Sequence, residues 1–192
     1  DSLFQIGSIT KVWTTTVVMQ LVDEGLVELD APLRRYLPDF RVADEGVAEA
    51  VTIRHLLTHS SGIDGDNFTD TGRGDDALEK YVASCAGLRH VHPLGATMSY
   101  CNTGFSLLGR VIEVATGETW DAAIRARLFE PMGLTHTATL PRTSSASAPR
   151  SGTSGRPGRS STPRRSGAFR ARPAPPAGSA RRRPRSRGSR SC

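Results

Sequence analysis

The chain has few cysteines, only two lysines and no long run of apolar residues. Its three cysteines, Cys85, Cys101 and Cys192, form an odd set with no paired spacing, which argues against a disulfide framework and favours free thiols. No stretch approaches the roughly 18 consecutive apolar residues of a membrane-spanning helix, and no basic-then-apolar signal segment opens the chain. We therefore expect no membrane span, and the sequence leaves the cellular location open.

Acidic residues are absent from residues 142–192, which divides the chain into two unlike segments. This segment holds 14 Arg and a formal charge of +14, whereas residues 1–141 carry −8. It also lacks Val, Ile, Leu and Met, so it cannot bury enough apolar surface to offset the roughly 1–2 kcal/mol per residue that ordering a backbone costs. We expect a folded domain over residues 1–141 and a disordered tail over residues 142–192.

Two interpretations of this tail are open. An arginine-rich arm could bind nucleic acid non-specifically through phosphate contacts, with an affinity that falls steeply as salt rises. Alternatively, a frameshifted reading of GC-rich DNA would give this composition, because every basic residue in the tail is arginine and its main residue types have GC-rich codons. The moderately acidic body itself gives no reason to expect nucleic acid or an anionic membrane as a partner.

Apolar spacing within residues 1–141 predicts a series of helices joined by loops. Ser8, Thr52 and Thr119 are expected to cap helices at their N-termini, and Gly25 and Gly117 to end them. The first helix is apolar enough to be buried on most of its surface. The predicted helices cover residues 9–24, 53–59, 76–85, 104–117 and 120–129, and Asn102 or Thr103 is expected to lead into the fourth of them.

The stretch "FQIGSITK" places a serine and a lysine one helical turn apart. Ser8 Oγ and Lys11 Nζ can therefore approach each other, and Gly7 allows close approach from outside. A serine hydroxyl needs a base to take its proton, and a lysine in apolar surroundings can share that work because burial lowers the pKa of an ammonium group. The helix N-terminus and the Ser8 N–H can stabilise an oxyanion. A capping serine beside a snorkelling lysine would give the same spacing.

The stretch "SYCN" offers partners for that pair. Tyr100 and Asn102 are two residues apart on an extended segment and therefore point to the same side. A tyrosine phenol near a lysine cation can act as the general base for a serine, and an asparagine amide can hold both the lysine and a substrate carbonyl. An ordinary core tyrosine followed by an asparagine helix cap is the structural alternative.

The histidines suggest a different class of enzyme. His55 and His59 are four residues apart, and His90 and His92 flank a valine, so a metal hydrolase can be imagined. However, "HLLTH" lacks the glutamate of the zinc-protease motif, and "HVH" lacks the further ligands of a metal-dependent β-lactamase. We expect no metal site, and we interpret His59 as a turn residue that bonds the backbone of "HSSG".

Taken together, these stretches resemble the penicillin-recognising serine hydrolase family. "FQIGSITK" is similar to its Ser-x-x-Lys element, and "YCN" is similar to the Tyr-x-Asn element of class C β-lactamases, D-alanyl-D-alanine carboxypeptidases and family esterases. "TIRHLLTHSSGI" and "EPMGLTHT" also resemble the family in order and spacing, so the resemblance covers about residues 1–140. It implies Ser8 as acyl-accepting nucleophile, Lys11 and Tyr100 as the proton-transfer pair and Asn102 as a substrate-positioning residue.

The resemblance also implies a fold and a reaction. The fold would be α+β and β-lactamase/transpeptidase-like, and we expect the chain to open within that domain, with mainly its helical portion and an incomplete antiparallel sheet. The reaction would be acyl transfer from the lactam, amide or ester carbonyl of a small-molecule or peptide substrate. It requires no metal and no organic cofactor.

Two departures from the family pattern affect the expected activity. Cys101 stands where a small residue, often serine, is usual, which would place a thiol beside the site. The third family element, Lys or His, then Ser or Thr, then Gly, is missing from the 192 residues. Because its strand would supply an oxyanion donor and part of the sheet, we expect weak or no activity, and a catalytically incompetent remnant of the family is an alternative.

Overall fold

The computed structural model describes residues 4–139. The expected tail at residues 142–192, with its possible nucleic-acid contacts, and the domain boundary after residue 141 lie outside these residues. Within residues 4–139, no helix combines the length and the hydrophobicity that crossing a bilayer requires.

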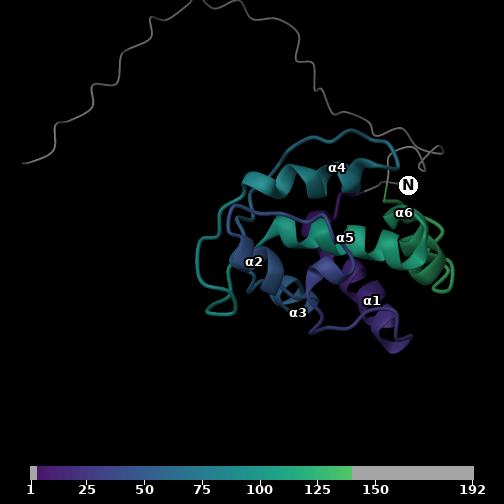
Figure 1. Ribbon diagram of the computed structural model, residues 1–192. Helices are drawn as coiled ribbons and strands as arrows, with labels where there is room; N and C mark the ends of the chain where they lie inside the picture. Colours follow the sequence, from purple (N-terminus) through teal and green to yellow (C-terminus); the bar gives the residue numbers. More distant parts are fainter. Residues whose placement is uncertain (1–3, 140–192) are drawn as a thin grey trace, which may run out of the picture. The chain divides into compact units, whose positions relative to one another are not determined.

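The described residues form helices joined by loops (Figure 1). The α-helices are α1 (Thr10–Asp23), α2 (Glu45–Ala50), α3 (Ile53–Leu57), α4 (Ala77–Ser84), α5 (Asn102–Thr116) and α6 (Trp120–Ile124). Shorter helical turns are η1 (Gly7–Ile9), η2 (Leu33–Arg35), η3 (Cys85–Gly87) and the π-helical η4 (Arg125–Phe129). The helices predicted from apolar spacing are confirmed. The caps Thr52 and Thr119 are confirmed too, because each side chain accepts a hydrogen bond from a backbone N–H three residues later.

Helix α5 is the central element of the described part. It contacts α1, α3, α4 and α6, and Figure 1 shows it running between α4 on one side and α1 and α3 on the other. Complete burial of a leucine or isoleucine contributes about 1.5–3 kcal/mol, so the buried side chains of α5 stabilise the fold. Its fully buried apolar residues are Leu107, Leu108, Val111 and Ile112.

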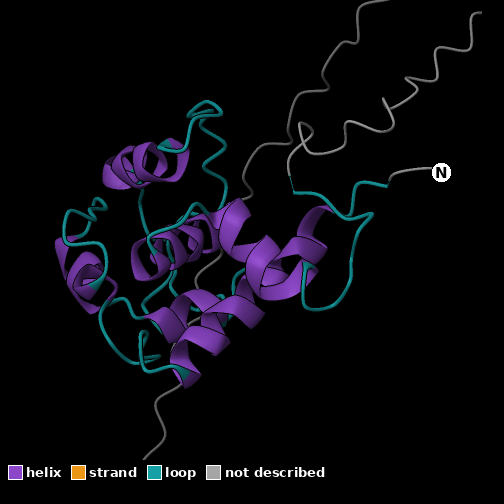
Figure 2. Cartoon of the chain, turned by 90° about the vertical axis from the view of Figure 1, so that its right-hand side faces the viewer, coloured by secondary structure: helices purple, strands orange, loops and turns teal. Residues whose placement is uncertain are grey.

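The antiparallel sheet is not found in residues 4–139, where Figure 2 shows helices and loops. Extended segments meet there through isolated antiparallel bridges, Pro32 with Thr52 and Ile63 with His90. A proline has no N–H to donate, so Pro32 cannot extend its bridge into a regular ladder. The helical part of the α+β prediction is therefore confirmed, and the sheet stays a prediction.

One expectation for the first helix is wrong. Ser8 does not cap α1: the turn η1 precedes the helix, and Ile9 occupies the N-cap position without a side-chain hydrogen bond. The expected burial of most of the surface of α1 is confirmed, because its residues are buried or half-buried except for Val12, Thr16, Met19 and Asp23. Val12 is 62% exposed.

Helix α2 escapes prediction from the sequence. Its residues, "EGVAEA", contain too few large apolar side chains to show a helical period. The helix forms because the Asp44 side chain accepts a hydrogen bond from the Val47 N–H, and because Val47 and Ala48 are buried. Capping and packing against η2 therefore override a weak local pattern.

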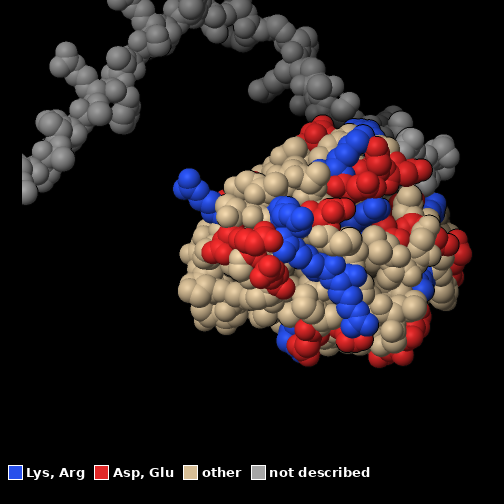
Figure 3. All heavy atoms as spheres, in the orientation of Figure 1, with Lys and Arg blue, Asp and Glu red and all other residues tan. Residues whose placement is uncertain are grey.

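Charged side chains of both signs are interspersed over the face shown in Figure 3. Several of them pair across elements: Arg54 with Asp30, Arg127 with Glu24, and Arg110 with Glu79. The hydrogen bond from Arg127 is the main cause of the lowered pKa of Glu24. The hydrogen bond from Arg54 is the main cause of the lowered pKa of Asp30.

Candidate active site

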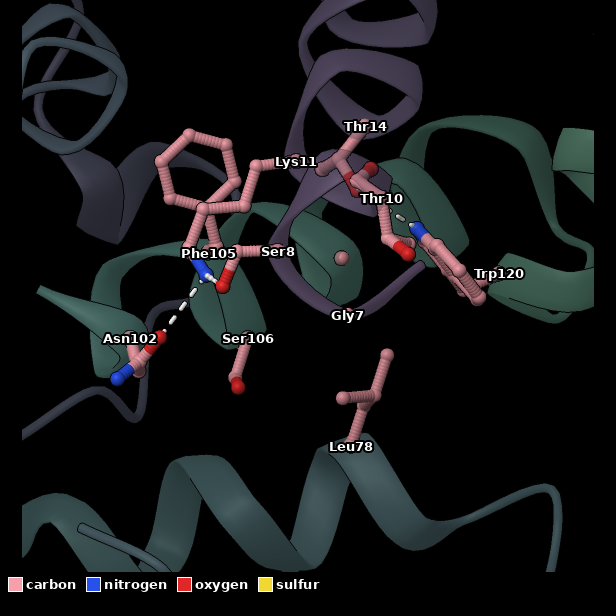
Figure 4. Close-up of a pocket in the computed structure, with 11 residues that line it drawn as sticks. Gly7, Ser8, Thr10, Lys11, Thr14, Leu78, Asn102, Phe105, Ser106 and Trp120 are labelled. Carbon is pink, nitrogen blue, oxygen red and sulfur yellow. Dashed lines mark hydrogen bonds between the residues drawn. The ribbon is translucent and has the colours of Figure 1, made fainter. Parts of the chain in front are cut away.

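Ser8, Lys11, Tyr100 and Asn102 come together where the start of α1 meets the segment that leads into α5. Lys11 Nζ lies 3.3 Å from Ser8 Oγ and donates to Asn102 Oδ1 at 2.8 Å (Figure 4). The Tyr100 hydroxyl donates to Ser8 Oγ at 2.8 Å. The structure thus joins two motifs that lie about ninety residues apart in the chain.

The backbone around Ser8 explains the glycine before it. Gly7 has a φ of 52°, in the left-handed region where glycine is favoured, and a Cβ at this position would meet nothing within 4 Å. Its role is therefore conformational: it turns the chain into η1, so that Ser8 precedes α1 by two residues. The expectation that Gly7 allows close approach from outside stays a prediction.

The alternation predicted for the Tyr100–Asn102 stretch is present. Tyr100 and Asn102 point toward Ser8 and Lys11, whereas Cys101 is buried. The Cys101 Sγ accepts a hydrogen bond from the Gly104 N–H at 3.2 Å and is the N-cap of α5. The expectation of a thiol beside the site is therefore wrong, because residue 101 faces the opposite side of the segment. Burial raises the pKa of the Cys101 thiol.

The electrostatics of the site centre on the pair of Lys11 and Tyr100. The Lys11 ammonium lies 4.8 Å from the centroid of the Tyr100 ring. Hydrogen bonding to Lys11, followed by hydrogen bonding to Ser8, lowers the pKa of the Tyr100 phenol. A phenol whose ionised form is favoured in this way can take a proton from Ser8 Oγ, which lies within hydrogen-bond reach.

A cavity of about 440 Å³ opens beside Ser8 and Lys11 (Figure 4). This volume lies within the range of small-molecule sites. The indole Nε1 of Trp120 donates to Thr14 Oγ1 at 3.2 Å and ties α6 to α1 at one wall. Other lining residues include Thr10, Leu78, Phe105 and Ser106.

His59 belongs to the surroundings of the site, which sequence reasoning missed. Its ring Nδ1 accepts a hydrogen bond from the Cys101 N–H at 3.1 Å. The ring centroid lies 4.6 Å from that of Tyr100 and 5.1 Å from that of Phe105. His59 is a turn residue, as expected, but its Nδ1 bonds the Cys101 N–H rather than the backbone of "HSSG". Its left-handed φ of 56° at the end of α3 is the local signal, because histidine is among the residues enriched there.

Three other histidines form contacts outside the group of Ser8, Lys11, Tyr100 and Asn102. His55 Nδ1 bonds Thr52 in a capping box, and His92 Nδ1 lies 2.9 Å from the Pro93 carbonyl oxygen. His90 Nδ1 lies 3.6 Å from a carboxylate oxygen of Asp44. Within the described part of the chain, no group of three or more His, Cys, Asp or Glu side chains is arranged to hold a metal ion.

Gly65 presses the loop after α3 against the Tyr100–Asn102 stretch. A Cβ at Gly65 would lie 2.8 Å from both the Tyr100 carbonyl oxygen and the Cys101 Cα, which are backbone atoms that cannot rotate away. The same loop is tied to α5, because Thr103 Oγ1 donates to the Asp64 carbonyl oxygen. A glycine at position 65 is thus a requirement of the site that no sequence motif announces.

Gly65→Ala is expected to displace Tyr100. Overpacking of this kind costs about 1–3 kcal/mol of unfolding free energy. The Tyr100 phenol would leave Lys11 and Ser8, and its pKa would rise toward the ordinary value of 10.0. Urea unfolding and an NMR titration of the tyrosine rings measure the two effects.

Gly87→Ala is the matched control, because a Cβ at Gly87 meets nothing within 4 Å. It should leave the Tyr100 pKa unchanged and should not destabilise the protein. If both alanine variants had the same stability and the same Tyr100 pKa, the close approach at Gly65 would have no role in placing Tyr100.

The sequence and fold resemble proteins that are already known. Residues 1–182 match the family model described as Beta-lactamase. The chain is 53% identical over 141 residues to penicillin-binding protein 4 of Amycolatopsis lactamdurans, an alignment that covers 73% of this chain and 37% of that protein. It is 34% identical over 149 residues to esterase EstB of Burkholderia gladioli, which covers 70% and 38% of the two chains.

The chain is also similar to a solved structure. The D-stereospecific amidohydrolase from Streptomyces sp. matches with a TM-score of 0.57 and 34% identity, over 70% of this chain and 43% of that one. The present chain thus spans less than half the length of each of these three relatives.

Proposed function

Because the chain belongs to the beta-lactamase family, we propose that it is a serine hydrolase in which Ser8 accepts the acyl group of a lactam, amide or ester. The contact between the Tyr100 hydroxyl and Ser8 Oγ, beside the Lys11 ammonium, is the observation that carries this proposal. It combines a nucleophile, a base within reach and a cation that tunes the base. The substrate is a small molecule or a peptide, and no metal or organic cofactor takes part.

The reaction follows from the positions of these groups. Tyr100, ionised with the help of Lys11, takes the Ser8 proton while Oγ forms a bond to the substrate carbonyl carbon. The carbonyl oxygen becomes an oxyanion near the N-terminus of α1, where the helix field is positive. The bond from carbon to the leaving nitrogen or oxygen then breaks, and the leaving group receives the proton from Tyr100.

Asn102 completes the arrangement in this proposal. Its Oδ1 accepts from Lys11, so the amide nitrogen is the end that can donate to a substrate carbonyl. Release of the acyl group requires water or another acceptor, which Tyr100 can activate in the same way. The four side chains thus supply the nucleophile, the base and the positioning groups for acylation, and the base for the start of deacylation.

We propose further that the 192-residue chain by itself turns over slowly. The third family element does not occur in these residues, and loss of one oxyanion donor typically lowers the rate by about 10²–10³-fold. The alternative, a remnant that does not react at all, differs in one respect: its Ser8 would not be acylated.

Hydrolysis of a chromogenic cephalosporin and of a p-nitrophenyl ester tests both parts of the proposal. We expect slow turnover by the purified chain, which Ser8→Ala removes. Fast steady turnover that Ser8→Ala abolishes would overturn the proposed impairment. Turnover that Ser8→Ala leaves unchanged would overturn the assignment of Ser8.

We also propose that the hydrolase portion occupies residues 1–141 and that residues 142–192 arise from a shifted reading frame. The support is composition: 14 Arg, no acidic residue and no Val, Ile, Leu or Met. The family model, by contrast, extends its match to residue 182. The encoding DNA decides the matter, because a shift near Pro141 should restore an apolar-patterned sequence with a His/Lys-Thr/Ser-Gly element. If no frame does so, this proposal is wrong.

A further inference from the structure

His59 accepts hydrogen bonds from the residues immediately before and after Tyr100. Its backbone carbonyl oxygen accepts a hydrogen bond from the Ser99 N–H at 2.8 Å. Its ring Nδ1 accepts from the Cys101 N–H at 3.1 Å. The ring packs against the Tyr100 ring between these two bonds, at a centroid distance of 4.6 Å and an interplanar angle of 33°. One residue at the end of α3 thus holds the backbone before and after Tyr100 and one face of its side chain.

We propose that His59 is a positioning residue that holds the Tyr100 hydroxyl against Ser8 by accepting the Cys101 N–H on a neutral imidazole ring. This inference rests on the proposed function of Ser8 for its meaning in catalysis. The geometric claim, that His59 places Tyr100, can be tested without any substrate. The His59 ring contacts Tyr100 and Cys101 rather than Ser8, so His59 acts through Tyr100.

The direction of the hydrogen bond fixes the form of the ring. A backbone N–H can only donate, so Nδ1 must be unprotonated, and the proton of the neutral ring is on Nε2. Protonation of Nδ1 would leave the Cys101 N–H without its acceptor. It would also place a second cation near Lys11, which already lies over the Tyr100 ring.

The surroundings favour the neutral ring. Burial, followed by the charge of Lys11, lowers the pKa of His59 below its ordinary value of 6.5. Lys11 is the charged group that faces the His59 ring from α1. The segment before α5 brings two titratable groups to the ring, Tyr100 and Cys101, and α5 itself brings the uncharged Phe105. The neutral ring therefore contributes its full stabilisation above pH 6.5, and this contribution is lost as the pH falls through the lowered pKa.

Two substitutions test the hydrogen-bond acceptor and the aromatic ring of His59 separately. His59→Asn keeps an acceptor close to the position of Nδ1, and asparagine tolerates the left-handed backbone at this position. His59→Phe keeps an aromatic ring against Tyr100 and removes the acceptor. Both are made in the full 192-residue chain, and urea unfolding reports the stability of each.

The pKa of Tyr100 is measured by NMR titration of the tyrosine ring. A purely structural role of His59 would leave this pKa unchanged. We expect His59→Asn to keep the lowered pKa of wild type. We expect His59→Phe to raise it toward 10.0, because the phenol leaves Lys11 and Ser8. Acylation of Ser8 by a β-lactam should fall about 10²-fold in His59→Phe, the size of effect that a misplaced catalytic group produces, and stay close to wild type in His59→Asn.

Wild-type protein supplies a second measurement in case His59→Phe does not fold. Nitrogen chemical shifts of the His59 ring should show the Nε2–H form at pH 7. The Cys101 amide resonance should shift together with the titration of His59. An Nδ1–H ring, or a folded His59→Phe variant with an unchanged Tyr100 pKa, would overturn the proposal.

These readouts are independent of the proposed function. If Ser8 of the wild-type chain is never acylated, the hydrolase assignment fails, while the Tyr100 pKa and the His59 ring form still decide whether His59 positions Tyr100. If acylation proceeds equally in wild type and in folded His59→Phe, the hydrolase assignment stands and the role of His59 is wrong.

Discussion

Lys11→Met should lower the rate of Ser8 acylation by about 10²–10⁴-fold, the contribution typical of a positioned acid–base group. Methionine has a similar length but neither a charge nor a donor. It removes the contacts of Nζ to Ser8 and Asn102 and the hydrogen bonding to Tyr100 that is the largest cause of the lowered Tyr100 pKa. The pKa of Tyr100 should therefore rise in the same variant. Adduct formation with a β-lactam, followed by mass spectrometry over time, gives the rate.

The second lysine of the chain is the matched control. Lys80 is exposed on α4, where it pairs with Asp76 at 2.7 Å. Lys80→Met makes the same chemical change away from Ser8, and we expect it to leave the acylation rate unchanged. Equal rates in the two methionine variants would exclude Lys11 from the reaction.

Tyr100→Phe should lower the acylation rate by a similar factor, about 10²–10⁴-fold, while leaving the local packing intact. The phenylalanine ring can keep the contacts to His59 and to the Lys11 ammonium, so the loss isolates the hydroxyl that reaches Ser8. Because the site then lacks its proposed base, the rate should also lose the pH dependence that Tyr100 gives it.

Tyr36→Phe is the control for the loss of a hydroxyl. The Tyr36 hydroxyl accepts a hydrogen bond from the Glu28 N–H at 2.8 Å, outside the candidate site. The acylation rate should be unchanged in this variant. If Tyr100→Phe also acylated at the wild-type rate, the proton would leave Ser8 by another route and Lys11 would be the base instead.

The candidate site could be proposed from the sequence because its two motifs are local patterns. A spacing of three residues places Ser8 beside Lys11, and alternation along an extended segment places Tyr100 beside Asn102. The approach of one pair to the other followed from the family resemblance rather than from either pattern. The structure brings all four residues together.

The supporting residues could not be predicted in the same way. His59 and Gly65 act through backbone atoms of a segment more than thirty residues away, and such contacts leave no periodic signal. Cys101 caps α5 with a thiol, a role usually filled by Ser, Thr, Asp or Asn, so the N-cap preferences of the residues do not predict it. Ser8 illustrates the opposite error: its residue type favours a cap, but η1 and the neighbouring Lys11 and Tyr100 engage it differently.

The longer helices could be predicted from the sequence, because apolar spacing and the caps Thr52 and Thr119 are sufficient to place them. Which residues stay exposed depends on the partners of each helix, and in α1 the apolar side chain of Val12 is 62% exposed.

The most direct test of the account is the site of covalent modification after long incubation of the 192-residue chain with a β-lactam or an activated ester. Trypsin cleavage after Lys11 isolates the first eleven residues, and fragmentation of that peptide distinguishes Ser8 from Ser2 and Thr10. We expect one acyl group per chain, carried by Ser8. An unmodified peptide from a folded chain, or an acyl group on any other residue, would contradict the assignment of Ser8 as the nucleophile.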